Sequence, residues 1–139
     1  MSILITYVLG AQTTHLHCGQ VFDSASGKIK KEQTVIVEGT VITAITKGYS
    51  IVKSDDIRVI DLKSKTVYPG FIDMHVHIES ESNPKAYLNR YRLNEADVAY
   101  DAAVYAKRSL MAGFTSVRDM GGSGVNIALR NAIEKGKIP

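Results

Sequence analysis

Cysteine is nearly absent from this chain, and so are long apolar runs. Cys18 is the single cysteine among the 139 residues, so neither a disulfide within the chain nor a cysteine-based zinc cluster can form. No stretch approaches the roughly 18 to 20 consecutive apolar residues of a transmembrane helix. We therefore expect no membrane-spanning segment and no membrane partner.

A long basic stripe is missing as well. The net charge is +3, the sequence pI is about 9.0, and the densest basic group is Lys28, Lys30 and Lys31 beside a turn-like Ser-Gly pair. A nucleic-acid groove needs a longer basic stripe with interleaved aromatic residues, so we expect no nucleic-acid partner. The composition that remains, 45% hydrophobic and 22% charged, is typical of a globular protein.

The N-terminal segment allows two interpretations. Residues 3–11 are apolar apart from Thr6 and end in the small pair Gly10-Ala11. This resembles the tail of a secretory signal, but the positive region that precedes such a tail is absent. The same segment also suits a β-strand. Localisation therefore stays open between the cytoplasm and export.

The first half of the chain reads as short strands. Runs rich in β-branched residues are separated by Gly, Ser, Asp and Lys, and they occupy residues 14–22, 34–37, 41–45, 58–61 and 66–68. A Glu-Gly-Thr connection between the second and third runs predicts a hairpin. Residues 1–68 are therefore expected to form part of a small β-sandwich.

The second half, residues 69–139, has a different pattern. A buried-type strand over 71–78 and a polar loop precede a helix over 95–112, which Asn94 caps. A strand over 115–118, a glycine-rich loop over 121–124 and a helix over 125–135 follow. This alternation predicts an α/β fold with a parallel sheet, in which two βα units are too few to close a barrel.

A histidine pair lies in the first of these strands. Residues two apart in a strand point to the same face, so Asp73, His75 and His77 share one face. Two imidazoles at this spacing can hold one metal ion, and Asp73 is placed to orient a ligand or its neighbours. The spacing alone is weak, because His15 and His17 share it; we interpret those two as surface-facing strand histidines.

Other polar residues have competing interpretations. Arg118, near the end of the second strand, is a candidate to bind a substrate carboxylate, although an ion pair with Asp119 or a nearby loop explains it equally well. The glycine-rich loop over residues 121–124 suits a tight turn better than a phosphate cradle. Glu79 and Glu81 follow the histidine pair, and a solvated loop is their default interpretation.

Three segments resemble the amidohydrolase superfamily. The run from Val67 to His77 is similar to its P-G-[FL]-[IV]-D-x-H-x-H signature, which begins the first barrel strand. Residues 112–122 and 128–139 resemble the following strand and helix. The combination is most similar to the imidazolonepropionase-related branch, which includes Xaa-Pro and Xaa-Arg/Lys dipeptidases.

The resemblance implies a fold and a chemistry. It implies a partial small β-sandwich followed by the first two βα units of a metal-dependent (β/α)₈ (TIM) barrel. It also implies one or two divalent metals, with zinc expected, bound in part by His75 and His77. The family's metal activates water that attacks an amide or related C–N bond, so the implied substrate is a small amide or dipeptide.

The resemblance also implies further metal ligands from later barrel strands: a carboxylated lysine or a glutamate, two histidines and an aspartate. These have no counterparts in this sequence. We therefore expect the chain alone to be an incomplete and inactive fragment that needs the missing remainder of the enzyme or forms a homo-oligomer. The alternative is a non-catalytic truncated protein that self-associates through exposed sheet edges.

Overall fold

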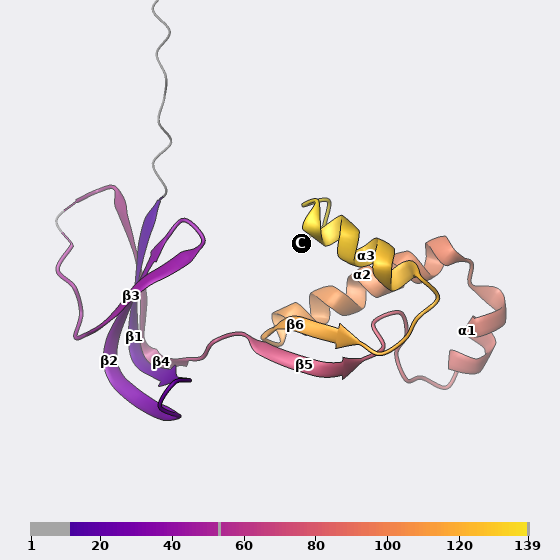
Figure 1. Cartoon of the computed structure of the whole chain (residues 1–139), viewed down its shortest axis with the longest axis horizontal. Helices are drawn as coiled ribbons and strands as arrows, with labels where there is room; N and C mark the ends of the chain where they lie inside the picture. The colour runs from indigo at the N-terminus through magenta and orange to yellow at the C-terminus, as the bar shows by residue number, and fades with distance from the viewer. Residues whose placement is uncertain (1–11, 53, 139) are drawn as a thin grey trace, which may run out of the picture. The chain divides into compact units, whose positions relative to one another are not determined.

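The computed structural model describes residues 12–52 and 54–138 and divides into two compact units (Figure 1). One unit extends to Pro69 and the other begins at Gly70. The apolar segment 3–11 lies outside the described residues. Among the described residues, no helix is long and apolar enough to cross a bilayer.

The first unit contains a four-stranded sheet. Its strands are β1 (Thr13–Asp23), β2 (Lys28–Glu38), β3 (Val41–Lys47) and β4 (Ile57–Val67), in the order β3-β2-β1-β4. The β1–β2 and β2–β3 pairs are antiparallel, as the predicted hairpin requires, and β1–β4 is parallel. One sheet is present in the described part of this unit, so a sandwich partner for it stays a prediction.

Strand β4 differs from the expectation of two separate short strands. Residues 63–65, whose polar character suggested a break, lie at an irregularity in the register: Cys18 pairs with Leu62, whereas Gln20 pairs with Thr66. Gly19 stands opposite this irregularity, and a Cβ built on it would lie 2.0 Å from the Lys63 carbonyl oxygen. The strand therefore continues through a bulge that glycine makes possible.

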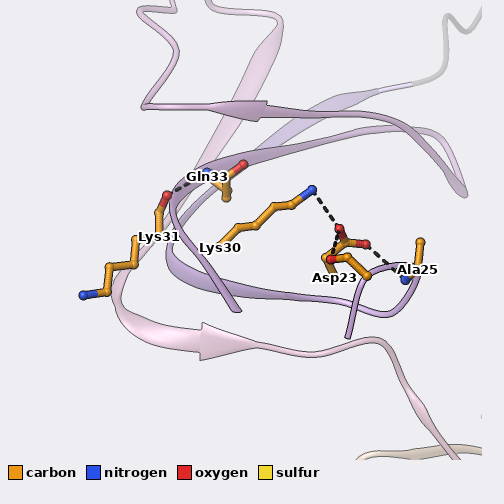
Figure 2. A network of polar contacts seen from close by, with 6 residues as sticks. Asp23, Ala25, Lys30, Lys31 and Gln33 are labelled. Carbon is orange, nitrogen blue, oxygen red and sulfur yellow. Dashed lines mark hydrogen bonds and ion pairs between the residues drawn. The ribbon is translucent and has the colours of Figure 1, made fainter. Parts of the chain in front are cut away.

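The turn between β1 and β2 is held by one carboxylate. Asp23 accepts hydrogen bonds from the Ala25 backbone N–H (3.1 Å) and the Ser26 hydroxyl (2.7 Å), and it pairs with the Lys30 ammonium at 2.7 Å (Figure 2). The neighbouring Gln33 side chain donates to the Lys31 carbonyl at 2.6 Å. Part of the basic cluster seen in the sequence therefore serves the hairpin.

The core of the first unit is small. Cys18, Val21 and Val35 are buried, and four half-buried side chains pack against them: Leu16, Val37, Leu62 and Val67. These residues come from β1, β2 and β4, so the cluster joins three of the four strands of the sheet.

The second unit is built from two parallel strands and three helices. Strands β5 (Phe71–Val76) and β6 (Phe114–Asp119) pair in parallel; α1 (Ala86–Arg92) and α2 (Glu95–Met111) connect them, and α3 (Val125–Glu134) follows. The sequence pattern predicts a polar loop where α1 lies, so this helix was not expected. None of its residues is buried, so no apolar stripe marks it.

Helices α2 and α3 lie side by side against the strand pair (Figure 1). Helix α2 begins with the expected capping box, in which Asn94 accepts from the Asp97 backbone and Asp97 accepts from the Asn94 backbone. Its alanine stripe packs against Ile78, Val125 and Leu129. The small side chains on α2 allow close packing and fix one side of β5.

Candidate metal site

The histidine pair lies where β5 ends. His75 is in the strand and His77 is one residue beyond it, and both are exposed. The alternate residues point to the other face of the strand. Val76 and Ile78 pack there against the helices, as expected, whereas Met74 remains 57% exposed. The strand is thus held from one side while the two imidazoles stay accessible.

The two rings are close enough to share an ion. Their centroids are 5.5 Å apart, with the planes inclined at 70°. Two imidazoles that bind one tetrahedral ion through nitrogens at about 2.0–2.1 Å place their centroids about 5 Å apart. The donor chemistry and the ring separation therefore fit a divalent metal.

One ring nitrogen of His77 already forms a hydrogen bond within the chain. Its Nδ1 lies 3.1 Å from the Gly121 carbonyl oxygen. A carbonyl can only accept, so Nδ1 must carry the proton, and in the neutral ring Nε2 is left with a free lone pair. Histidine ligands in metal sites commonly have this second hydrogen bond to a carbonyl or carboxylate.

Asp73 contacts the backbone of this pair. Its Oδ1 accepts the His75 backbone N–H at 3.0 Å, and the side chain is half-buried. The contact fixes the main chain that supports His75 rather than its ring. Gly70 directly precedes the strand. A Cβ on it would clash with Thr115 Oγ1, so glycine at this position lets the start of β5 approach β6 closely.

Two further carboxylates join the loops around His77. Asp119, at the end of β6, accepts the backbone N–H groups of Gly121 (3.0 Å) and Ile78 (3.3 Å). Glu79, just after β5, accepts those of Ser123 and Asn126, both at 2.7 Å. Each loop therefore receives a carboxylate from the other. The sequence interpretation missed this role because the bonded groups are 41 to 47 positions apart in the chain.

Glu79 replaces an N-cap for α3. The cap position, Gly124, has no side chain to offer, and the Glu79 carboxylate meets the N–H groups at that end of the helix. Partial burial acts to raise its pKa, but the hydrogen bonds from Ser123 and Asn126 outweigh this, so the pKa lies below the ordinary value. The solvated-loop interpretation of Glu79 is wrong, and the glycine-rich loop binds an anion supplied by the chain itself.

A pocket opens beside His77. Its volume is about 630 Å³, and it is lined by the two loops and by α1 and α2, including His77, Glu79, Glu81, Arg90 and Tyr105. His75 and Arg118 are outside its lining. Burial raises the pKa of Tyr105, and nearby Asp101 and Glu81 add to the effect, so this phenol stays protonated at neutral pH.

Arg118 lies apart from that pocket. It is exposed, its Nε is 3.2 Å from the Met120 sulfur, and it lines a second pocket of about 450 Å³ with Leu129 and Ile133. Within residues 12–52 and 54–138, it forms no ion pair with Asp119, whose oxygens take backbone N–H groups instead. Substrate binding by Arg118 stays a prediction.

The prediction that His15 and His17 face the surface is wrong. Both are buried, with 9% and 8% exposure. Their Nδ1 and Nε2 atoms lie 2.6 Å and 3.1 Å from the Ser50 hydroxyl, and His17 also contacts the Tyr49 ring. Ser50, which satisfies them, is 35 positions from His15 and 33 from His17 in the sequence, so strand alternation alone gave no indication of it.

A complete metal-ligand set is absent from the described part of the chain. Its residues contain no group of three or more His, Cys, Asp or Glu side chains arranged to hold an ion. His75 and His77 would supply two donors, fewer than the three or four protein ligands of zinc sites.

Comparisons of sequence give a consistent family assignment. The family model described as Amidohydrolase family matches residues 66–138. A dihydroorotase from Pelotomaculum thermopropionicum is 38% identical over 60 residues, which is 43% of this chain and 13% of that protein. A dihydroorotase from Carboxydothermus hydrogenoformans is 36% identical over 59 residues, 42% of this chain and 13% of that protein.

Solved structures are similar over most of the chain. A Xaa-Pro dipeptidase with methionine bound in its active site matches with a TM-score of 0.83 and 33% identity, covering 91% of this chain and 31% of that one. A prolidase in complex with N-methylphosphonate-L-proline matches with a TM-score of 0.75 and 33% identity, covering 91% and 30%. The chain thus spans about a third of the structures it resembles, and its α/β fold matches their corresponding region.

Proposed function

The chain belongs to the amidohydrolase family, and we propose that residues 69–139 begin a metal-dependent (β/α)₈ barrel that hydrolyses amide or peptide C–N bonds. Residues 1–68 would then be part of the accompanying β-sandwich. In such barrels the reactive groups gather at the carboxyl ends of the strands. His77 and the loop residues Glu79 and Gly121 follow β5 and β6 at that end.

The observation that carries the proposal is the commitment of His77 Nδ1 to the Gly121 carbonyl, with the His75 ring 5.5 Å away. We propose that His77 and His75 are two ligands of a divalent ion, with zinc as the expected metal. Bound metal of this kind lowers the pKa of water and polarises a carbonyl. Asp73 would hold the His75 backbone, and the pocket beside His77 would receive the substrate.

The relatives support a proposal about the substrate class. Two structural relatives are a Xaa-Pro dipeptidase and a prolidase, and the curated relatives are dihydroorotases. We propose a small amide or dipeptide as substrate, with Arg118 as a candidate for its carboxylate. Two histidines hold a metal weakly, so the 139 residues alone are expected to be inactive until further ligands are supplied by the rest of a barrel.

The test is a cobalt or zinc titration of the whole chain, followed by the visible spectrum of cobalt and by calorimetry. His75→Ala and His77→Ala should each weaken binding by at least about tenfold. His15→Gln is the matched control, because it alters the other histidine pair and should leave the affinity unchanged. Unchanged binding in both alanine variants would falsify the metal assignment.

A second candidate function rests on exposed apolar residues. In the described part of the chain, β5 and β6 each pair with one strand, and Ile72 and Met74 are 63% and 57% exposed. Open edges of this kind favour pairing with another chain. Sedimentation of a metal-free sample distinguishes the two candidates: a reversible oligomer that Met74→Lys weakens supports self-association, and a monomer at every concentration contradicts it.

A further inference from the structure

We propose that Asp119 is a positioning residue for His77. It acts through Gly121, whose peptide it holds in the orientation that fixes the His77 proton on Nδ1. The role of that nitrogen in metal binding rests on the proposed function above, whereas the orientation itself does not.

The contacts form a short relay. Asp119 Oδ1 accepts the Gly121 N–H at 3.0 Å, and the Gly121 carbonyl accepts His77 Nδ1–H at 3.1 Å. Asp119 Oδ2 accepts the N–H of Ile78, the residue directly after His77, at 3.3 Å. One half-buried carboxylate therefore holds both the main chain beside His77 and the acceptor of its ring.

The chemistry of the relay requires a carboxylate. Both backbone groups that face Asp119 are donors, and an ionised carboxylate offers two acceptor oxygens and no donor. An asparagine offers one oxygen and one NH₂ group, so one of the two N–H groups would face another donor. The Gly121 peptide should then rotate, or its N–H should lose the hydrogen bond to residue 119.

The rest of the loop has its own anchors. Met120 N–H donates to the Val76 carbonyl at 3.0 Å, and Glu79 holds Ser123 and Asn126. Removal of the Asp119 charge should therefore leave the ends of the loop in place and change the Gly121 peptide between them. Without the Gly121 acceptor, the His77 proton is free to move to Nε2, which blocks the nitrogen that remains for a metal.

The test is nitrogen NMR of the histidine side chains in the ¹⁵N-labelled full chain, at a pH where they are neutral. In the wild type, His77 should carry its proton on Nδ1; in Asp119→Asn, a large fraction should move to Nε2. Asp61→Asn is the matched control: Asp61 also accepts a backbone N–H, that of Lys63 at 2.9 Å, but lies in the first unit. It should leave the His77 spectrum unchanged.

A cobalt titration of the same variants supplies the second readout. Asp119→Asn should weaken binding by about 10- to 100-fold, the usual effect of losing a residue that orients a ligand. If the wild type binds no cobalt through His77, the proposed function fails, while the proton position in the metal-free chain still tests the positioning role.

An unchanged His77 proton in folded Asp119→Asn overturns the proposal, as does a wild type that carries the proton on Nε2. If Asp119→Asn does not fold, the test moves to the wild type. NMR couplings are then measured across the hydrogen bonds from the Gly121 and Ile78 amides to the Asp119 carboxylate carbon. Their presence together with an Nδ1 proton on His77 supports the relay, and their absence overturns it.

Discussion

The two units each contain a pair of histidines separated by one residue, and the pairs lie in opposite environments. His15 and His17 are buried in the sheet of the first unit, and both approach the hydroxyl of Ser50. His75 and His77 are exposed at the end of β5, and the polar contact of His77 involves Nδ1 and a backbone carbonyl. Identical spacing thus gives one closed and one open arrangement.

The difference lies in the partners rather than in the histidines. A hydroxyl donates one hydrogen bond and can also accept, so Ser50 satisfies one ring as donor and the other as acceptor. The Ser50 N–H is in turn held by Thr34, whose hydroxyl donates to the Gly48 carbonyl. Such a network stabilises a fold. The His77 ring has one nitrogen hydrogen-bonded to a carbonyl, which leaves the lone pair of the other chemically able to bind a ligand, and that role stays a proposal.

The two histidine pairs should differ most in what they contribute to the free energy of unfolding. His17→Ala should lower the free energy of unfolding of the first unit by about 2 to 4 kcal/mol, because it leaves a buried cavity and removes a hydrogen bond to Ser50. His77→Ala should cost about 1 kcal/mol or less, since the ring is exposed. Amide hydrogen exchange in β1 and in α2 reports on each unit separately.

The control for this prediction is Ser50→Ala, which removes the shared hydroxyl and should approach the His17→Ala effect. Equal losses for His17→Ala and His77→Ala would show that the buried pair has no special structural role.

Much of the fold could be predicted from local patterns. The β2–β3 hairpin, the capped helix α2 and the order of strand, helix, strand, helix follow from periodicity, caps and glycines, which act over a few residues. Helix α1 was missed because none of its residues is buried, and the division of β4 was wrong because the bulge depends on its neighbour β1.

The candidate site was predictable to a smaller extent. The family signature predicts His75 and His77 as metal ligands, and that assignment stays a prediction. The residues that surround them become visible only when the loops after β5 and β6 meet. Glu79 contacts residues 44 and 47 positions away, and Asp119 contacts one 41 positions away. No local pattern encodes such contacts, and the burial of His15 and His17 was misjudged for the same reason.

The loop beside the open pair offers a second, smaller test. Glu79→Gln should destabilise the second unit by about 1 to 2 kcal/mol, because an amide replaces the charged acceptor of two backbone N–H groups at the start of α3. Glu81→Gln is the matched change in the same loop. Glu81 pairs with Arg108 at the surface, so its loss should cost less than about 0.5 kcal/mol.

Hydrogen exchange of the α3 amides measures this difference. If Glu79→Gln and Glu81→Gln have equal effects, the Glu79 carboxylate does not hold the loop after β6. Another contact must then position this loop beside His77.

The smallest expected effect is the pH dependence of the stability of the first unit. Hydrogen bonds from Lys30 and Ser26 lower the pKa of Asp23 from 3.8 to about 2. A carboxyl whose pKa is lower in the folded state stabilises that state above its unfolded pKa, and the contribution disappears as pH falls through the folded pKa. The first unit should therefore lose this stabilisation between about pH 4 and pH 2.

Asp23→Asn should flatten that part of the pH profile of β1 and β2 hydrogen exchange. Asp61→Asn is the control: it removes a carboxyl from the same sheet that has no contact with Lys30, and it should leave the profile unchanged. An equally steep profile in Asp23→Asn would show that the contacts of Asp23 at the β1–β2 turn do not account for the acid sensitivity of this unit.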